Sequence, residues 1–152
     1  MDLTIIVVPV FSNIRTDEAH VEALTSRLFT ARLKRIVDMV EAMKEAISCK
    51  DIPIIGRLAE EDSINLHAIT MTGKLHVVLW EPETVRVIKE VIKMRAEGVP
   101  AWYSMDTGPS VFINTVKDQT EEVVQRLTEL RLPKVIVSGV GDGPSVSNSH
   151  LF

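Results

Sequence analysis

One acidic residue, Asp106, lies in a short turn between two apolar segments and is the first candidate for chemistry. The turn is Asp106-Thr-Gly-Pro-Ser110, and it separates Ala101–Met105 from Val111–Val116. Gly and Pro at this spacing are typical of a hairpin connection. An Asp in such a turn often caps it through an Asx hydrogen bond, so the pattern alone favours a structural role.

Two other patterns could bind an anion. The glycine-rich stretch Gly139–Gly143 follows an apolar segment, as a phosphate-binding loop would. Such a loop opens a helix whose N-terminus faces the anion, whereas Pro144 and a serine-rich tail follow here, so we interpret it as an ordinary loop. The hydroxyl pair Thr25-Ser26 falls inside a predicted short helix, where such residues usually hydrogen-bond to the backbone.

Metal binding and disulfide formation have little support in the sequence. The single cysteine, Cys49, excludes an internal disulfide and a cysteine-based zinc site, and it favours a cytoplasmic location. The histidines lack carboxylates at ligand spacing, and we interpret them as surface or cap residues. They are His20, His67, His76 and His150.

Composition narrows the class of protein further. The 152 residues fit one domain, 1–152, with 45% hydrophobic residues and a net charge of −4. This charge, with a pI near 5.6, argues against nucleic acid as a partner. The apolar run Leu3–Val10 is too short to span a bilayer, and Asp2 replaces the basic start of a signal peptide. We therefore expect a soluble cytoplasmic protein with no membrane contact.

Strands and helices alternate in an order that predicts the fold. The segment Leu3–Val10 is apolar on both faces, as a central strand would be, and Pro9 should lie near its end. The order strand, helices, strand, strand, helix, strand predicts an α+β fold of the ferredoxin-like, split βαβ type, with extra helices in the first crossover. The other expected strands are Ala101–Met105, Val111–Val116 and Lys134–Ser138, and Leu75–Trp80 looks extended.

Helical periodicity and capping signals locate five helices. The stripe from Leu33 to Ile47 is expected to be buried along one helix. Asp118 and Glu121 read as a capping box for the last helix. The other expected helices run from about Glu18 to Phe29, from Asp51 to Ile69, and from Pro82 to a stop at Gly98, and the last runs to Leu130.

Four stretches, in order, resemble one family. Tyr103-Ser-Met-Asp-Thr-Gly-Pro-Ser110 is similar to the family pattern Tyr-Thr-x-Asp-Ala-Gly-Pro-Asn and is the most specific of them. The family is diphosphomevalonate decarboxylase, of the GHMP kinase superfamily, and the resemblance covers nearly the whole chain, beginning where the family's second domain begins. The other matching stretches are Thr25–Phe29 with Arg32, Asp62–Ala68, and Val135–Gly143 with Pro144.

The resemblance implies a reaction and roles for two residues. ATP, with Mg, would phosphorylate the tertiary 3-hydroxyl of a mevalonate phosphate, and loss of that phosphate and of carbon dioxide would leave the isopentenyl product. Asp106 matches the family's Asp at the 3-hydroxyl. A carboxylate with a pKa of about 3.9 is too weak to deprotonate a tertiary alcohol beforehand, so we expect it to orient the hydroxyl and take the proton late. Thr25 matches a residue that touches the substrate's phosphate tail.

Departures from the family pattern concern the substrate. Thr107 and Ser110 replace Ala and Asn, and Asn13–His20 stands where the family has Ser-Ser-x-x-Gly-Met. These changes resemble archaeal-type relatives that use mevalonate, its monophosphate or its 3,5-bisphosphate. A phosphomevalonate decarboxylase, a bisphosphomevalonate decarboxylase and a mevalonate 3-kinase therefore stay as alternatives.

The family's nucleotide loop is missing from these 152 residues. The chain is therefore expected to be the C-terminal domain of a longer enzyme, with ATP and Mg bound mainly by an absent N-terminal domain, and to be inactive alone. Expected partners are the mevalonate phosphate, that domain, and a second copy in a homodimer. Asp106 and Thr25 should lie on one side of the domain, in an open groove, both accessible to solvent. A non-catalytic ferredoxin-like binding module is the alternative of another class.

Overall fold

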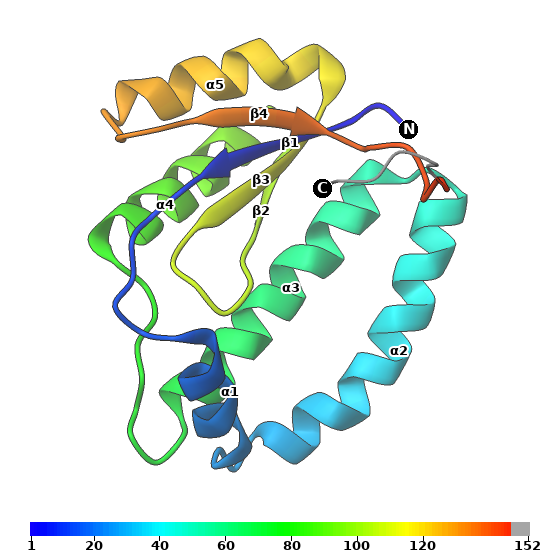
Figure 1. The fold of residues 1–152 in the computed structure, drawn as a ribbon. Helices are drawn as coiled ribbons and strands as arrows, with labels where there is room; N and C mark the ends of the chain where they lie inside the picture. Colours follow the sequence, from blue (N-terminus) through cyan, green and yellow to red (C-terminus); the bar gives the residue numbers. More distant parts are fainter. Residues whose placement is uncertain (147–152) are drawn as a thin grey trace.

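The first strand lies in the middle of an antiparallel sheet, as predicted (Figure 1). The computed structural model describes residues 1–146, so His150 lies outside the described residues. The sheet order is β2-β3-β1-β4, and β1 pairs antiparallel with both β3 and β4. This order confirms the split βαβ prediction. The strands are β1 (Leu3–Val8), β2 (Ala101–Ser104), β3 (Val111–Val116) and β4 (Ile136–Gly139), and Pro9 follows the end of β1.

Four helices connect β1 to β2, and one connects β3 to β4 (Figure 1). This confirms the insertion in the first crossover. The helices are α1 (Thr16–Leu24), α2 (Phe29–Ser48), α3 (Ile52–Met71), α4 (Pro82–Ala96) and α5 (Thr120–Glu129). Among residues 1–146, no helix is both long enough and apolar enough to cross a bilayer.

The two faces of the sheet are covered by different helices. Because side chains alternate along a strand, Tyr103 and Trp102 of β2 point to opposite faces. Tyr103 joins the main core, where the sheet packs against α4 and α5. Trp102 is buried on the other face, where it lies against Gly56 of α3. The helix α2 packs on α3, outside the sheet (Figure 1).

Local signals set three of the helix ends as expected. The Asp51 carboxylate accepts a hydrogen bond from the Ile54 amide at 3.0 Å and caps α3. Pro82 begins α4, where its missing N–H costs nothing. Gly98 follows the end of that helix with φ +94°, a conformation that favours glycine.

Three helical predictions were wrong. In α2 most of the predicted buried stripe is exposed: Val37 is 64% exposed, whereas Ile36 and Met43 are half-buried. The buried residues of this helix are Met39 and Ala46. The expected capping box is a 3₁₀ turn, Lys117–Gln119, so α5 begins later without a side-chain cap. The first helix begins and ends earlier than expected, which leaves Thr25 at its C-terminal end.

Two other segments are irregular. Leu75–Trp80 forms no strand. The stretch after Gly139 is irregular through residue 146, which confirms an ordinary loop there.

Candidate active site

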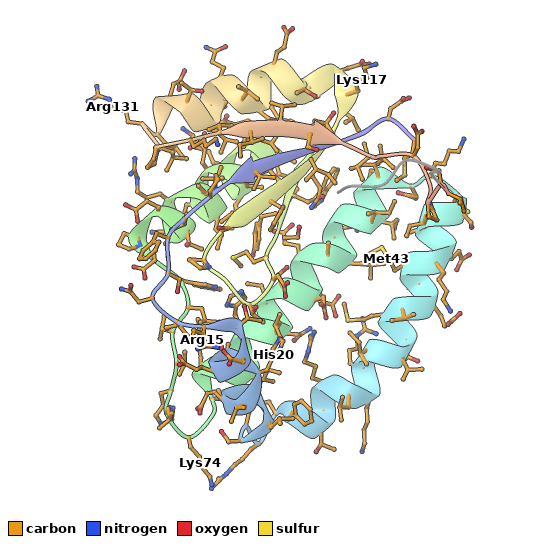
Figure 2. All side chains as sticks on the ribbon, in the orientation of Figure 1. Arg15, His20, Met43, Lys74, Lys117 and Arg131 are labelled. Carbon is orange, nitrogen blue, oxygen red and sulfur yellow. The ribbon has the colours of Figure 1, made fainter. Side chains whose placement is uncertain are left out.

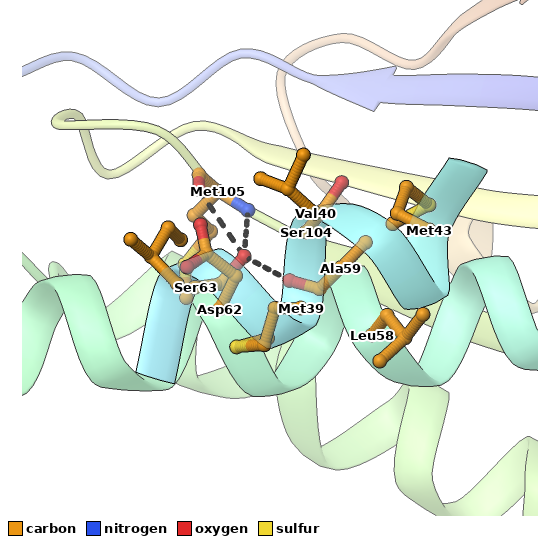
Figure 3. Close-up of a pocket in the computed structure, with 10 residues that line it drawn as sticks. Met39, Val40, Met43, Leu58, Ala59, Asp62, Ser63, Ser104 and Met105 are labelled. Carbon is orange, nitrogen blue, oxygen red and sulfur yellow. Dashed lines mark hydrogen bonds between the residues drawn. The ribbon is translucent and has the colours of Figure 1, made fainter. Parts of the chain in front are cut away.

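The loop from Met105 to Ser110, which joins β2 to β3, is held by hydroxyl groups from neighbouring elements. Ser63 of α3 accepts a hydrogen bond from the Met105 amide at 2.8 Å, and its oxygen lies 3.2 Å from the Met105 carbonyl (Figure 3). Thr84, in the first turn of α4, donates to the Pro109 carbonyl at 2.7 Å. These bonds fix the main chain at both ends of the loop.

Two further contacts tie the same loop to the start of the chain. Ser110 accepts from the Val10 amide at 3.0 Å and lies 3.2 Å from the Val10 carbonyl oxygen. The hydroxyls of Thr107 and Thr16, the latter in the first turn of α1, lie 3.3 Å apart. The loop is therefore anchored to α1, α3, α4 and the segment after β1, although these elements are distant in sequence.

Asp106 projects from this anchored loop into solvent. Its neighbours Met105 and Thr107 are buried, whereas Asp106 is exposed. Its carboxylate makes no hydrogen bond to any other side chain or main-chain group of residues 1–146, so the Asx cap suggested by the turn pattern is not formed. The predicted accessibility of Asp106 is confirmed. A carboxylate on a fixed main chain, with free lone pairs, can accept a proton or a hydrogen bond from a ligand hydroxyl.

His67 lies one helical turn after Ser63 on α3 and is fully buried. Its ring is 5.7 Å from that of Trp80, and neither ring nitrogen has a hydrogen-bond partner among the described residues. Burial lowers the pKa of His67, and the nearby main-chain carbonyl and carboxylate of Asp106 partly oppose this. The prediction that the histidines are surface or cap residues was therefore wrong for His67.

The burial of His67 predicts how stability depends on pH. Its folded-state pKa lies below the ordinary value of 6.5, so the unfolded chain binds a proton where the folded chain does not. The free energy of unfolding should therefore fall as the pH drops through 6.5 towards the folded pKa. We expect His67→Phe to flatten this dependence in urea titrations, and the exposed His20→Gln to keep it. Equal slopes for His67→Phe and wild type would contradict the assignment.

Ser63 should contribute measurably to stability through its bonds to the loop. Ser63→Ala leaves the buried Met105 amide without its acceptor, at a cost of about 1–2 kcal/mol. Urea unfolding measures this loss, and Ser48→Ala is the control because Ser48 is exposed. A change for Ser63→Ala no larger than that of the control would show that the loop does not depend on this bond.

Thr25 ends α1, and its hydroxyl serves the local backbone. The hydroxyl donates to the Glu22 carbonyl at 2.7 Å and accepts from the Lys74 amide at 2.8 Å. The side chain is half-buried, so it is partly accessible, as expected. The Asp106 loop contacts the other end of α1, at Thr16. A nine-residue helix is about 13 Å long, so this contact and Thr25 are separated by the length of α1. Figure 2 shows Arg15 and Lys74 at these two ends of α1.

A mostly apolar cavity of about 300 Å³ lies between α2, α3 and the end of β2 (Figure 3). Met39 and Met43 of α2 line it, together with Ser63 and Met105. Neither Asp106 nor Thr25 is among its lining residues, so this cavity is not the groove expected to contain both.

The family of the chain follows from comparison with known proteins. A family model described as the C-terminal domain of mevalonate 5-diphosphate decarboxylase matches residues 16–134. The chain belongs to this family. Phosphomevalonate decarboxylase of Haloferax volcanii is 38% identical over 145 residues, which are 95% of this chain and 44% of that protein. The chain thus spans less than half the length of this relative.

Two other comparisons agree with this family. Mevalonate 3,5-bisphosphate decarboxylase of Thermoplasma acidophilum is 30% identical over 108 residues, 70% of this chain and 25% of that protein. The solved structure of the mevalonate diphosphate decarboxylase from Enterococcus faecalis, studied for its ATP binding, has a TM-score of 0.81 at 23% identity. It covers 90% of this chain and 42% of that one. This likeness confirms the fold.

The structure places Ser63 and His67 of this decarboxylase-family domain against the Asp106 loop, which the sequence analysis did not predict. The stretch Asp62–Ala68 was recognised as a family segment, but not as the support of the Asp106 loop. Ser63 and His67 are four residues apart, which places both on one face of a helix, and this spacing was a readable signal. Asp62 faces α2 instead, where its Oδ1 lies 2.6 Å from Nη1 of Arg32.

Proposed function

We propose that this chain is the C-terminal domain of an ATP-dependent decarboxylase of the mevalonate pathway, with Asp106 as its catalytic residue. The observation that carries the proposal is the exposed Asp106 carboxylate, free of partners among residues 1–146, on a loop anchored by four elements. Membership of the decarboxylase family supports the reaction. The chain matches only 44% of the length of its Haloferax volcanii relative. We therefore propose the decarboxylase activity for a longer protein that contains this domain.

Asp106 would act on the tertiary 3-hydroxyl of the substrate. Because its main chain is anchored, the carboxylate can hold the hydroxyl in line with the entering phosphoryl group without a large loss of entropy. It would accept the hydroxyl proton late, as the new O–P bond forms. Phosphate then leaves with the C–O electrons, and the electrons of the C–CO₂ bond form the alkene as carbon dioxide departs.

The described residues do not fit a nucleotide or magnesium site. Residues 1–146 contain no group of three His, Cys, Asp or Glu side chains placed to hold a metal ion. The glycine-rich stretch Gly139–Gly143 is not followed by a helix within the described residues. We therefore propose that ATP and Mg bind outside this chain, in the part that the longer relatives possess.

Two substrates that differ in their number of phosphate groups are candidates. Mevalonate 5-diphosphate, converted to isopentenyl diphosphate, is the family's substrate by its description. The monophosphate is a second candidate, favoured by the 38% identity to a phosphomevalonate decarboxylase along 95% of this chain. A cytoplasmic location and a homodimer remain predictions.

A contact between Thr25 and the substrate's phosphate tail is a further part of the proposal. Support comes from the adjacent N-terminus of α2, whose free amides favour an anion. Against it stands the donation of the Thr25 hydroxyl to Glu22. Thr25→Val should raise KM several-fold with kcat unchanged, and Thr25→Ser should restore KM. Unchanged KM in Thr25→Val would leave Thr25 a purely structural residue.

The deciding experiment supplies ATP and Mg with each mevalonate phosphate and measures ADP and carbon dioxide. We expect both products from the full-length protein that carries this domain, and neither from the chain alone. ADP without carbon dioxide would identify a 3-kinase. No turnover of any mevalonate phosphate by the full-length protein would favour a binding module, and turnover by the chain alone would refute the division between two domains.

A further inference from the structure

We propose that His67 is a positioning residue for Asp106: its buried ring supports the Asp106 main chain from the protein interior and so directs the carboxylate outwards. This inference rests on the proposed function of Asp106. It adds a residue that acts through Asp106 and does not itself touch the substrate.

The position of the ring is the first observation. Ser63 and His67 occupy successive turns of α3 and face successive residues of the loop: Ser63 binds Met105, and the His67 ring lies near the Asp106 carbonyl. The ring has no exposed surface, and Trp80 packs against it at 5.7 Å. Its orientation is therefore set by packing and not by solvent.

The missing hydrogen bonds are the second observation. Both ring nitrogens are buried and have no partner among residues 1–146. A buried polar ring without partners destabilises a fold, and a phenyl ring would fill the same space at lower cost. A histidine here is therefore best explained by a bond that forms as the loop moves, in the free chain as well as over substrate. The Asp106 carbonyl lies close to the ring, and a small movement of the loop would complete the bond.

The burial of the ring also bears on its charge. Burial holds the pKa of His67 below its ordinary value, so the ring is neutral at neutral pH and has one N–H to donate. A charged ring beside Asp106 would pair with its carboxylate and weaken it as a proton acceptor. A neutral ring supports the main chain and leaves that carboxylate free.

Kinetics of the full-length protein test the proposal. His67→Phe keeps the ring and removes the donor, and we expect kcat to fall at least tenfold, with KM for ATP within twofold and a melting temperature unchanged or higher. His67→Asn and His67→Gln place an N–H near Nδ1 and Nε2 respectively, and one of them should recover most of kcat. The exposed His20→Gln is the control. Wild-type kcat in His67→Phe, a parallel fall in melting temperature, or no recovery in either amide variant would overturn the proposal.

A second measurement uses the chain itself and separates this inference from the proposed function. ¹⁵N relaxation should show greater mobility of the Asp106 and Thr107 amides in His67→Phe than in wild type. Unchanged relaxation would overturn the positioning role even if the enzyme is a decarboxylase. Absence of turnover in the wild-type full-length protein would overturn the proposed function, while the relaxation result would still decide whether His67 supports the loop.

Discussion

Asp106→Asn is expected to lower kcat for phosphorylation of the 3-hydroxyl by roughly 10²–10⁴-fold. Asn has the shape of Asp but cannot accept the proton in the transition state. ATP and substrate affinities should stay within a few-fold, because the change removes an interaction made chiefly in the transition state. Release of ADP and of carbon dioxide from the full-length protein measures both steps.

The same variant should fold normally. The Asp106 carboxylate is exposed and has no hydrogen-bond partner among the described residues, so its replacement leaves no buried group unpaired. Asp118→Asn is the matched control, because Asp118 is also exposed and lies outside the loop, in the 3₁₀ turn that follows β3. Near-normal kcat in Asp106→Asn would reduce Asp106 to a surface residue of the turn. Loss of kcat together with loss of folding would leave the catalytic assignment without support.

The strand order was predictable because each strand has a clear local sequence pattern that fits no other element. The β1 segment carries apolar side chains on both faces, with Thr4 as its polar residue, which suits a strand paired on both sides, and Pro9 lies where the ladder stops. The burial of α2 was not predictable in the same way. Its apolar residues cover a face wider than one neighbouring helix can bury, and the sequence does not say which half faces α3. The structure buries Met39 and leaves Val37 in solvent.

For the candidate site, too, the local features were predictable and the contacts between distant elements were not. Asp106 was identified as a candidate from its turn and its family pattern, both of which are local. The anchors of its loop were not found, because they are contacts between distant elements: Ser110 binds Val10, and Thr84 binds Pro109. His67 was misjudged because periodicity alone does not distinguish a buried polar ring from a cap residue. Its spacing of one turn from Ser63 becomes informative only when the loop is known to lie against α3.

Gly56 allows α3 to approach the sheet closely. This approach also places α3 against the loop that carries Asp106. A Cβ added at Gly56 would lie 2.4 Å from Cγ and 2.8 Å from Cβ of Trp102. These are not the far end of a flexible chain: Trp102 is buried on β2, which is paired along β3. A larger residue at 56 must therefore push the helix from the sheet. The same helix carries Ser63 and His67, so a shift would also loosen the loop.

Gly56→Val is therefore expected to lower the free energy of unfolding by at least about 3 kcal/mol, at the upper end of overpacking costs. Replacing a glycine in a helix interior should by itself stabilise the helix, but by less than about 1 kcal/mol. The clash with Trp102 therefore decides the sign of the change in the free energy of unfolding. Chemical denaturation measures the loss. Trp102→Ala in the same chain removes Cγ, the nearest of these atoms, together with the ring. The double variant should therefore lose less than the sum of the two single losses, by at least about 0.5 kcal/mol. Strict additivity, or a stable Gly56→Val chain, would mean that α3 does not depend on this close approach.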